Sequence, residues 1–348
     1  MPSSIFLPAD DHGAPLHAKQ RALIFYVPGN PGLIDFYDDF LRCLASLIRA
    51  SDLTTAYDIY GGDLRGFRDD DHEPFGNSST SSSSDAQPWD LNGQVEAVYD
   101  AVSSQRRRDN GAPYDFVVMM GHSVGAYITV EVFSRHARQA AQRAPHLVLR
   151  NGVLLFPTLT DIALSRNGRQ MALLNRFPWV GDRAHRVAVL LLMLVSQGVL
   201  AWFMERVMGF TGHAARVTAA WLKSRDGVHQ AIHLGRSEMR SIREDEWEEE
   251  LWEVAEAGGG DGPGLPRFYL YYGRDDEWVA SHLRDEFVEK KKGRARVVVD
   301  EGDVPHAFCT KEKTTLFIAK KVSEWVEEME GVRKDKGTAN ITESSVQE

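Results

Sequence analysis

The hydrophobic positions of the chain follow two alternating patterns. Short apolar runs that predict strands lie at about residues 22–27, 56–60, 116–120, 152–156, 268–272 and 296–299. Between them, apolar residues three and four positions apart predict helices over about residues 34–49, 91–102, 124–141, 281–292 and 313–329. Fully apolar strands that alternate with helices are typical of a mostly parallel sheet. The pattern therefore predicts an α/β fold with helices on both faces of a central sheet.

The alternation breaks over residues 157–265, which are helical in character and hold no convincing strand. We interpret this segment as a helical cap inserted over one end of the sheet, and we expect an acidic helix near residues 242–257 to pack on it. Residues 1–156 and 266–330 would then form the two parts of the core. The polar residues 331–348 are expected to be a disordered tail.

Bulk composition narrows the function classes. The formal net charge of -10 should repel nucleic acid, so we expect no nucleic-acid partner. Two cysteines in 348 residues make no disulfide framework, which indicates a reducing compartment. The first eleven residues carry no basic residue and no long apolar stretch, so we expect no signal peptide and a protein that faces the cytosol.

One serine stands in a motif that carries chemistry. Gly121-His122-Ser123-Val124-Gly125 matches G-x-S-x-G, which is a weak signal alone but here lies between an apolar strand and an amphipathic helix. The glycines at both ends would let the tight turn close against neighbouring backbone. We predict that Ser123 is a nucleophile and that Gly121 and Gly125 are its elbow glycines. The alternative is a glycine-rich turn with an idle serine.

Transfer at an ester carbonyl needs two N–H donors aimed at the developing oxyanion. The backbone N–H of Val124, directly after the nucleophile, is expected to be one of them. The other should come from the loop Pro28-Gly29-Asn30-Pro31-Gly32, in which the prolines have no N–H. Asn30 is the best candidate and Gly29 the next, unless the loop is a plain turn.

The acid and the base of such a site follow the serine along the chain. Asp275 and Asp276 both come just after a late strand; we prefer Asp276, although both carboxyls could simply cap the next helix. Of the 12 histidines, His306 is the one that follows the next strand. The order Ser123, Asp276, His306 predicts an α/β-hydrolase fold with a serine hydrolase triad. No metal or nucleotide motif is present, so we expect no cofactor and no metal.

The cap holds an unusual apolar run. Residues 187–204 are 18 residues without a charge, a borderline length for crossing a bilayer, and Ser196-Gln197-Gly198 interrupts them. We expect a hairpin or kinked helix that dips into one leaflet. The side chains expected at the membrane interface are Trp179, Arg183, Arg186 and Trp202. The alternative is a pair of buried cap helices that line a pocket for an acyl chain.

Several stretches together resemble the lipid droplet-associated serine hydrolases. They are Val27-Pro28-Gly29-Asn30-Pro31-Gly32 with Phe36-Tyr37, Gly121-His122-Ser123-Val124-Gly125-Ala126-Tyr127, Leu155-Phe156-Pro157-Thr158, Asn167-Gly168, Tyr272-Gly273 with Asp276, and His306-Ala307-Phe308. The resemblance covers about residues 22–326. The serine-rich loop at residues 78–84 and the glycine-rich stretch before Leu265 depart from the family pattern and look like surface insertions.

The resemblance implies an enzyme on lipid droplets and endoplasmic reticulum, anchored at the cytosolic face through the cap. Its substrates would be sterol esters or other neutral lipid esters. Two other functions stay open at this point. One is a droplet or membrane interaction protein with a weak or unused hydrolase site, and the other is a soluble esterase or thioesterase with an apolar cap.

Overall fold

The seven strands of the structure form one sheet. The computed structural model describes residues 3–9, 18–75, 87–175, 192, 194–243, 247–252, 267–302 and 304–331. The strands are β1 (Ser4–Leu7), β2 (Gln20–Val27), β3 (Thr55–Gly62), β4 (Phe116–His122), β5 (Leu149–Leu155), β6 (Phe268–Gly273) and β7 (Arg296–Asp300). Across the sheet their order is β1-β3-β2-β4-β5-β6-β7. All neighbouring strands from β3 to β7 are parallel, and β1 alone runs antiparallel, against β3.

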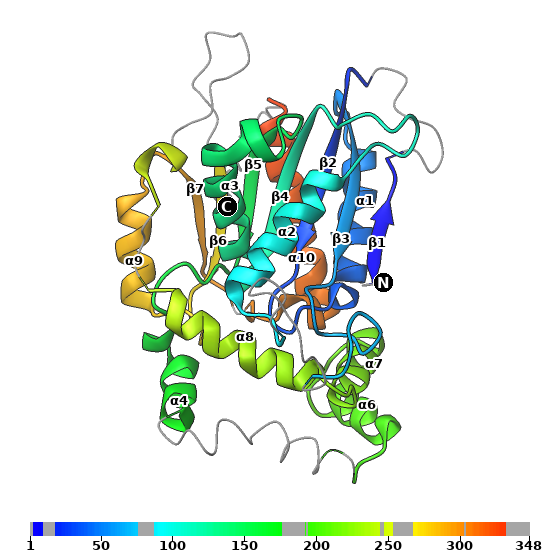
Figure 1. Ribbon diagram of the computed structural model, residues 1–348, viewed down its shortest axis with the longest axis vertical. Coiled ribbons are helices and arrows are strands. Elements are labelled where there is room, and N and C mark those ends of the chain that lie inside the picture. The colour runs from blue at the N-terminus through cyan, green and yellow to red at the C-terminus, as the bar shows by residue number, and fades with distance from the viewer. Residues whose placement is uncertain are drawn as a thin grey trace, which may run out of the picture.

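Helices cover both faces of this sheet (Figure 1). On one face lie α2 (Leu91–Ser104) and α3 (Val124–Arg143), and on the other lie α1 (Asp38–Ala50) and α10 (Glu312–Met329). A short 3₁₀ helix, η1 (Ile34–Tyr37), leads into α1, and α9 (Ser281–Lys290) joins β6 to β7. The predicted α/β-hydrolase class, a mostly parallel sheet between helices, is confirmed.

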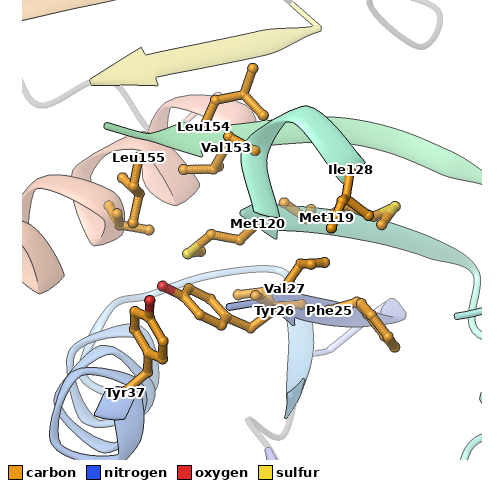
Figure 2. Packing of buried hydrophobic residues seen from close by; sticks show 14 of the residues in the cluster. Phe25, Tyr26, Val27, Tyr37, Met119, Met120, Ile128, Val153, Leu154 and Leu155 are labelled. Atoms are coloured by element: carbon orange, nitrogen blue, oxygen red, sulfur yellow. The ribbon is translucent and has the colours of Figure 1, made fainter. Parts of the chain in front are cut away.

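The core lies between the central strands and these helices. Every residue of β4 and β6 is buried, which explains the apolar runs Phe116–Met120 and Phe268–Tyr272 within them. Figure 2 shows side chains of β2, β4 and β5 packed together, with the rings of Tyr26 and Tyr37 side by side. The centroids of those two rings are 4.8 Å apart. This close packing holds the strand ends, and the loops that follow them, in fixed positions.

Strand β1 is not predicted by the sequence pattern. Its four residues alternate only weakly, with Ile5 and Leu7 turned toward the core. A run of this length gives almost no period-two signal. Its strand conformation comes from pairing with β3, more than fifty residues away along the chain.

The regular elements described between β5 and β6 are all helices, joined by short turns and loops. Its elements are η2 (Ile162–Leu164), α4 (Arg166–Asn175), α6 (Gln197–Arg206), α7 (Gly212–Leu222), α8 (Gly227–Ser241) and η3 (Glu249–Trp252). Figure 1 shows α4, α6, α7 and α8 gathered at one end of the sheet, at the bottom of the view. The boundaries of the cap and of the tail stay predictions, since residues 253–266 and 332–348 lie outside the described ranges.

The acidic helix expected near residues 242–257 is wrong for the part that is described. Helix α8 ends at Ser241, and only the short η3 follows. The two tryptophans of this stretch bind the core instead of the cap. The indole of Trp247 donates to Glu131 of α3 at 2.7 Å, and the ring of Trp252 packs on Phe268 of β6. Of the apolar face expected for this helix, Leu251 is buried and Trp247 is half-buried, whereas the fully buried Trp252 was not on that face.

Candidate active site

Ser123 occupies a sharp turn between β4 and α3. Its backbone has φ 54° and ψ -123°, a left-handed conformation that is strained for any residue with a Cβ atom. The flanking glycines make the turn possible. A Cβ atom on Gly121 would lie 2.1 Å from the carbonyl oxygen of Gly125, and one on Gly125 would lie 2.3 Å from the carbonyl oxygen of Val27. The turn therefore depends on both glycines and presents the serine at the end of the strand.

Three side chains that are far apart in sequence form one hydrogen-bonded row. The Ser123 Oγ lies 2.9 Å from His306 Nε2, and His306 Nδ1 lies 2.7 Å from Asp276 Oδ2. The other carboxylate oxygen of Asp276 accepts the backbone N–H of Trp278 at 2.8 Å. The Asp276 side chain is 1% exposed and the His306 side chain 15%. This geometry lets the imidazole accept the serine proton while the carboxylate holds the ring.

The side chains of Asp275 and Asp276 point in different directions in the structure. The Asp275 side chain is 82% exposed and pairs with its neighbour Arg274. Asp276 turns inward to His306. The open choice between the two aspartates is thus answered by geometry in favour of Asp276 as the partner of the histidine.

The loop after β2 approaches the elbow closely. A Cβ atom on Gly29 would lie 2.8 Å from the ring of His122, so glycine is needed there. The N–H of Gly29 donates to the hydroxyl of Tyr37 at 3.1 Å and is not available to a substrate. The N–H groups of Asn30 and Val124 have no acceptor among the residues that the structure describes. Of the two loop candidates, Asn30 keeps a free N–H.

A buried chain of hydrogen bonds joins the three loops of the site. The Tyr37 hydroxyl donates to His122 Nδ1 at 2.7 Å, and His122 Nε2 donates to the backbone carbonyl of His306 at 2.9 Å. Burial, with the adjacent His306, holds the pKa of His122 well below its usual range, so this ring is neutral. Sequence reasoning identified His122 only as part of the elbow and gave Tyr37 no role in the site.

A cavity of about 280 Å³ opens beside Ser123 and His306. Most of its wall is apolar, contributed by the core and by the helices after β5. The residues that line it include Pro31, Phe36, Ile162, Met171, Phe210, Trp221, Met239 and Trp278. Neither residue 192 nor any residue of the range 194–204 lines the cavity. Within the described ranges, no group of three or more His, Cys, Asp or Glu side chains is arranged to hold a metal ion.

Apart from residue 192, the apolar run of the cap is described only from residue 194 onward. Residues 187–191 and 193, together with Trp179, Arg183 and Arg186, lie outside the described residues. In the described part only Leu200 is buried, whereas the Leu194 side chain is 84% and the Trp202 side chain 59% exposed. Buried cap helices that line the pocket are therefore wrong for this part. No helix in the described ranges has the length and apolar character needed to span a membrane.

The chain is similar to one protein family over most of its length. The family model for lipid-droplet associated hydrolase matches residues 20–309. The lipid droplet-associated hydrolase of Mus musculus is 24% identical over 319 residues, which cover 89% of this chain and 86% of that protein. The Homo sapiens protein of the same description is 25% identical over 296 residues, with coverages of 84% and 81%.

Solved structures share the architecture at lower identity. The peroxisomal α/β-hydrolase from Saccharomyces cerevisiae aligns with a TM-score of 0.57 at 12% identity, and the alignment covers 99% of this chain and 93% of that chain. A laboratory-evolved variant of potato epoxide hydrolase aligns with a TM-score of 0.52 at 14% identity, with coverages of 89% and 93%. At these identities the likeness shows the fold alone.

Proposed function

The chain belongs to the lipid-droplet associated hydrolase family, and on that basis we propose that it is a serine hydrolase of lipid esters. Its substrates would be sterol esters or other neutral lipids, cleaved at the lipid droplet surface. The observation that carries the proposal is the row of Ser123, His306 and Asp276 beside a cavity with an apolar wall. Membership of this family supports hydrolase activity, whereas we infer the ester substrate from the geometry of the site.

The proposed reaction follows from these contacts. Ser123 Oγ attacks the acyl carbonyl while His306 Nε2 takes its proton, and the oxyanion is held by the N–H groups of Asn30 and Val124. His306 then gives the proton to the leaving alcohol, which departs and leaves an acyl-enzyme. Water, deprotonated by His306, then attacks the acyl carbon. The bond between this carbon and Ser123 Oγ breaks, the acid leaves, and His306 returns the proton to Ser123 Oγ. Asp276 stabilises the charged imidazole throughout, and no cofactor enters any step.

The apolar surface of α6 supports action at a lipid surface. Val199, Trp202 and Phe203 are exposed and lie at positions i, i+3 and i+4, so they share one helix face. Val207 and Met208 extend this exposed apolar surface beyond the helix. Contiguous exposed apolar side chains mark interaction sites. The family's description names lipid droplets, and we propose that this face docks on the droplet or on endoplasmic reticulum membrane from its cytosolic side.

Replacing Trp202 by glutamate is expected to weaken docking. Burying a large apolar side chain is worth about 1.5–3 kcal/mol, so binding to phospholipid-coated triacylglycerol droplets should fall about 10- to 100-fold. Val148→Glu is the matched control, because Val148 is 50% exposed, against 59% for Trp202, but precedes β5 at the opposite end of the sheet. Flotation of purified protein with the droplets measures the bound fraction. Equal binding by wild type and both variants would remove the docking proposal.

Hydrolysis of emulsified esters tests the enzymatic part. Wild-type protein should release fatty acid from cholesteryl ester or triacylglycerol emulsions, and prior treatment with a fluorophosphonate should abolish the release. Activity confined to short-chain water-soluble esters would favour a soluble esterase. Absence of both hydrolysis and fluorophosphonate labelling would favour a droplet interaction protein with an unused site.

A further inference from the structure

A carboxyl group stands in the wall of the cavity, outside the hydrogen-bonded row. Glu238, on α8, is 4% exposed and lines the cavity together with Ser123 and Asn30. Among the described residues that form this wall, it is the one carboxyl side chain. Its neighbour Met239 and most of the remaining wall are apolar. Burying an acid in such surroundings is costly unless it is hydrogen-bonded, so its presence calls for a partner.

Only one of the two carboxyl oxygens of Glu238 has such a partner. The Asn30 side-chain amide donates to Glu238 Oε1 at 3.2 Å and to the backbone carbonyl of Ala231 at 2.9 Å. Glu238 Oε2 has no hydrogen-bond partner among the residues that the structure describes. Oε2 is therefore available to hydrogen-bond a ligand in the cavity. It lies next to the loop in which the backbone N–H of Asn30 is also unpaired.

Helix α8 is held firmly against the core, so this oxygen has a defined place. The Gln230 side chain accepts the N–H of Trp89 at 3.0 Å and donates to its carbonyl at 2.7 Å. One turn before the end of the helix, Ser237 Oγ accepts the N–H of Leu91 at 3.1 Å. Together with the bonds from Asn30, these contacts fix α8 relative to the site.

The surroundings of Glu238 favour the neutral form of the acid. Burial raises the pKa of Glu238 to about 8, although the hydrogen bond from Asn30 acts in the opposite direction. Positions 234, 235 and 241, which share its face of α8, and position 242 just after the helix carry no ionisable group. The titratable groups that share the cavity from other elements are Tyr37 of η1, His122 of β4, Cys309 of η4 (Phe308–Thr310) and His306.

We propose that Glu238 is a specificity-determining residue whose free oxygen hydrogen-bonds a hydroxyl group of the substrate. A neutral carboxylic acid both donates and accepts, and so does a hydroxyl. A cationic or anionic group would fit poorly in the apolar wall. A sterol ester, whose one polar group is the reacting ester, would leave the acid unpaired. This inference rests on the proposed function. It predicts that, among neutral lipids, the enzyme prefers esters with a free hydroxyl group, such as partial glycerides.

Two oleate esters test this assignment. Glycerol monooleate carries hydroxyls, and propyl oleate has the same acyl chain and the same number of alcohol carbons without them. In detergent micelles, wild-type kcat/KM should favour glycerol monooleate by on the order of 10-fold, as expected for one buried hydrogen bond. Glu238→Leu should bring the ratio close to one. Met239→Leu, which alters the same wall without removing a polar group, should keep the wild-type ratio.

The outcomes separate this inference from the function on which it rests. A wild-type ratio near one, or a ratio unchanged by Glu238→Leu, would overturn the role of Glu238 and leave the hydrolase intact. Failure of wild type to cleave either ester would overturn the proposed ester hydrolase, and the role of Glu238 with it.

A second variant covers the case in which Glu238→Leu does not fold. Glutamine at position 238 can still accept from the Asn30 amide but cannot ionise. In wild type the preference for glycerol monooleate should rise as pH passes through about 8, because the carboxylate accepts the substrate O–H more strongly than the neutral acid does and is costlier to leave unpaired beside propyl oleate. With Glu238→Gln the ratio should stay flat from about pH 7 to 9. A flat wild-type ratio, or the same rise in both proteins, would contradict the proposal.

Discussion

Replacing Ser123 by alanine should lower kcat for ester hydrolysis by about 10⁶-fold and remove fluorophosphonate labelling completely. The hydroxyl is the atom that would form both the acyl-enzyme and the phosphonylated enzyme, and it lies 2.9 Å from its base. Alanine lacks that oxygen and has a Cβ atom at the same place, so the elbow at φ 54° should keep its geometry. Loss of activity would therefore report loss of chemistry and not of fold.

The matched control for this variant is Ser46→Ala. Ser46 is an exposed serine of α1 that hydrogen-bonds its own helix backbone at Arg42. Its replacement should leave rate and labelling within about twofold of wild type, as is usual for surface substitutions. Labelling that persists in Ser123→Ala would mean that another residue is the nucleophile and would contradict the proposed mechanism.

Asp276→Asn should lower kcat by about 10⁴-fold with little change in stability. The loss is expected because asparagine would hold His306 in the wrong tautomer. In wild type, Oδ1 of the Asp276 carboxylate accepts from the Trp278 N–H, and Oδ2 accepts from His306 Nδ1. An asparagine must keep its oxygen on the Trp278 N–H, since its NH₂ group cannot accept. The NH₂ group would then donate to Nδ1 of His306 and force the ring proton onto Nε2, where it blocks proton transfer from the serine.

Asp275→Asn removes the same charge one residue away. The Asp275 side chain points into solvent and pairs only with Arg274 among the described residues, so activity should stay within about twofold of wild type. Steady-state kinetics of the two variants at pH 7, with unfolding midpoints as the check on fold, compare them directly. Equal losses would show that bulk negative charge, and not the hydrogen bond to His306, is what matters. A loss only in Asp275→Asn would reverse the assignment of the acid.

The linear pattern of residues was sufficient for most of the fold. Helices and strands of the core were predicted within a few residues, because periodicity of burial is a local property that the chain carries along its length. The same holds for the elbow. Gly121, Ser123 and Gly125 are neighbours, and the strand before them and the helix after them can both be read locally. The candidate histidine also followed from its position after a late strand.

What the pattern left open depended on contacts between distant segments. Asp275 and Asp276 are equivalent in spacing, and only the position of His306, thirty residues further on, distinguishes them. Asn30 and Gly29 were both possible donors until the Tyr37 hydroxyl was found to occupy the N–H of Gly29. Glu238 had no local signal at all, because its meeting with Asn30 joins residues 208 positions apart. Short-range periodicity predicts which residues are buried, whereas the partners that bury them are selected by packing of the whole chain.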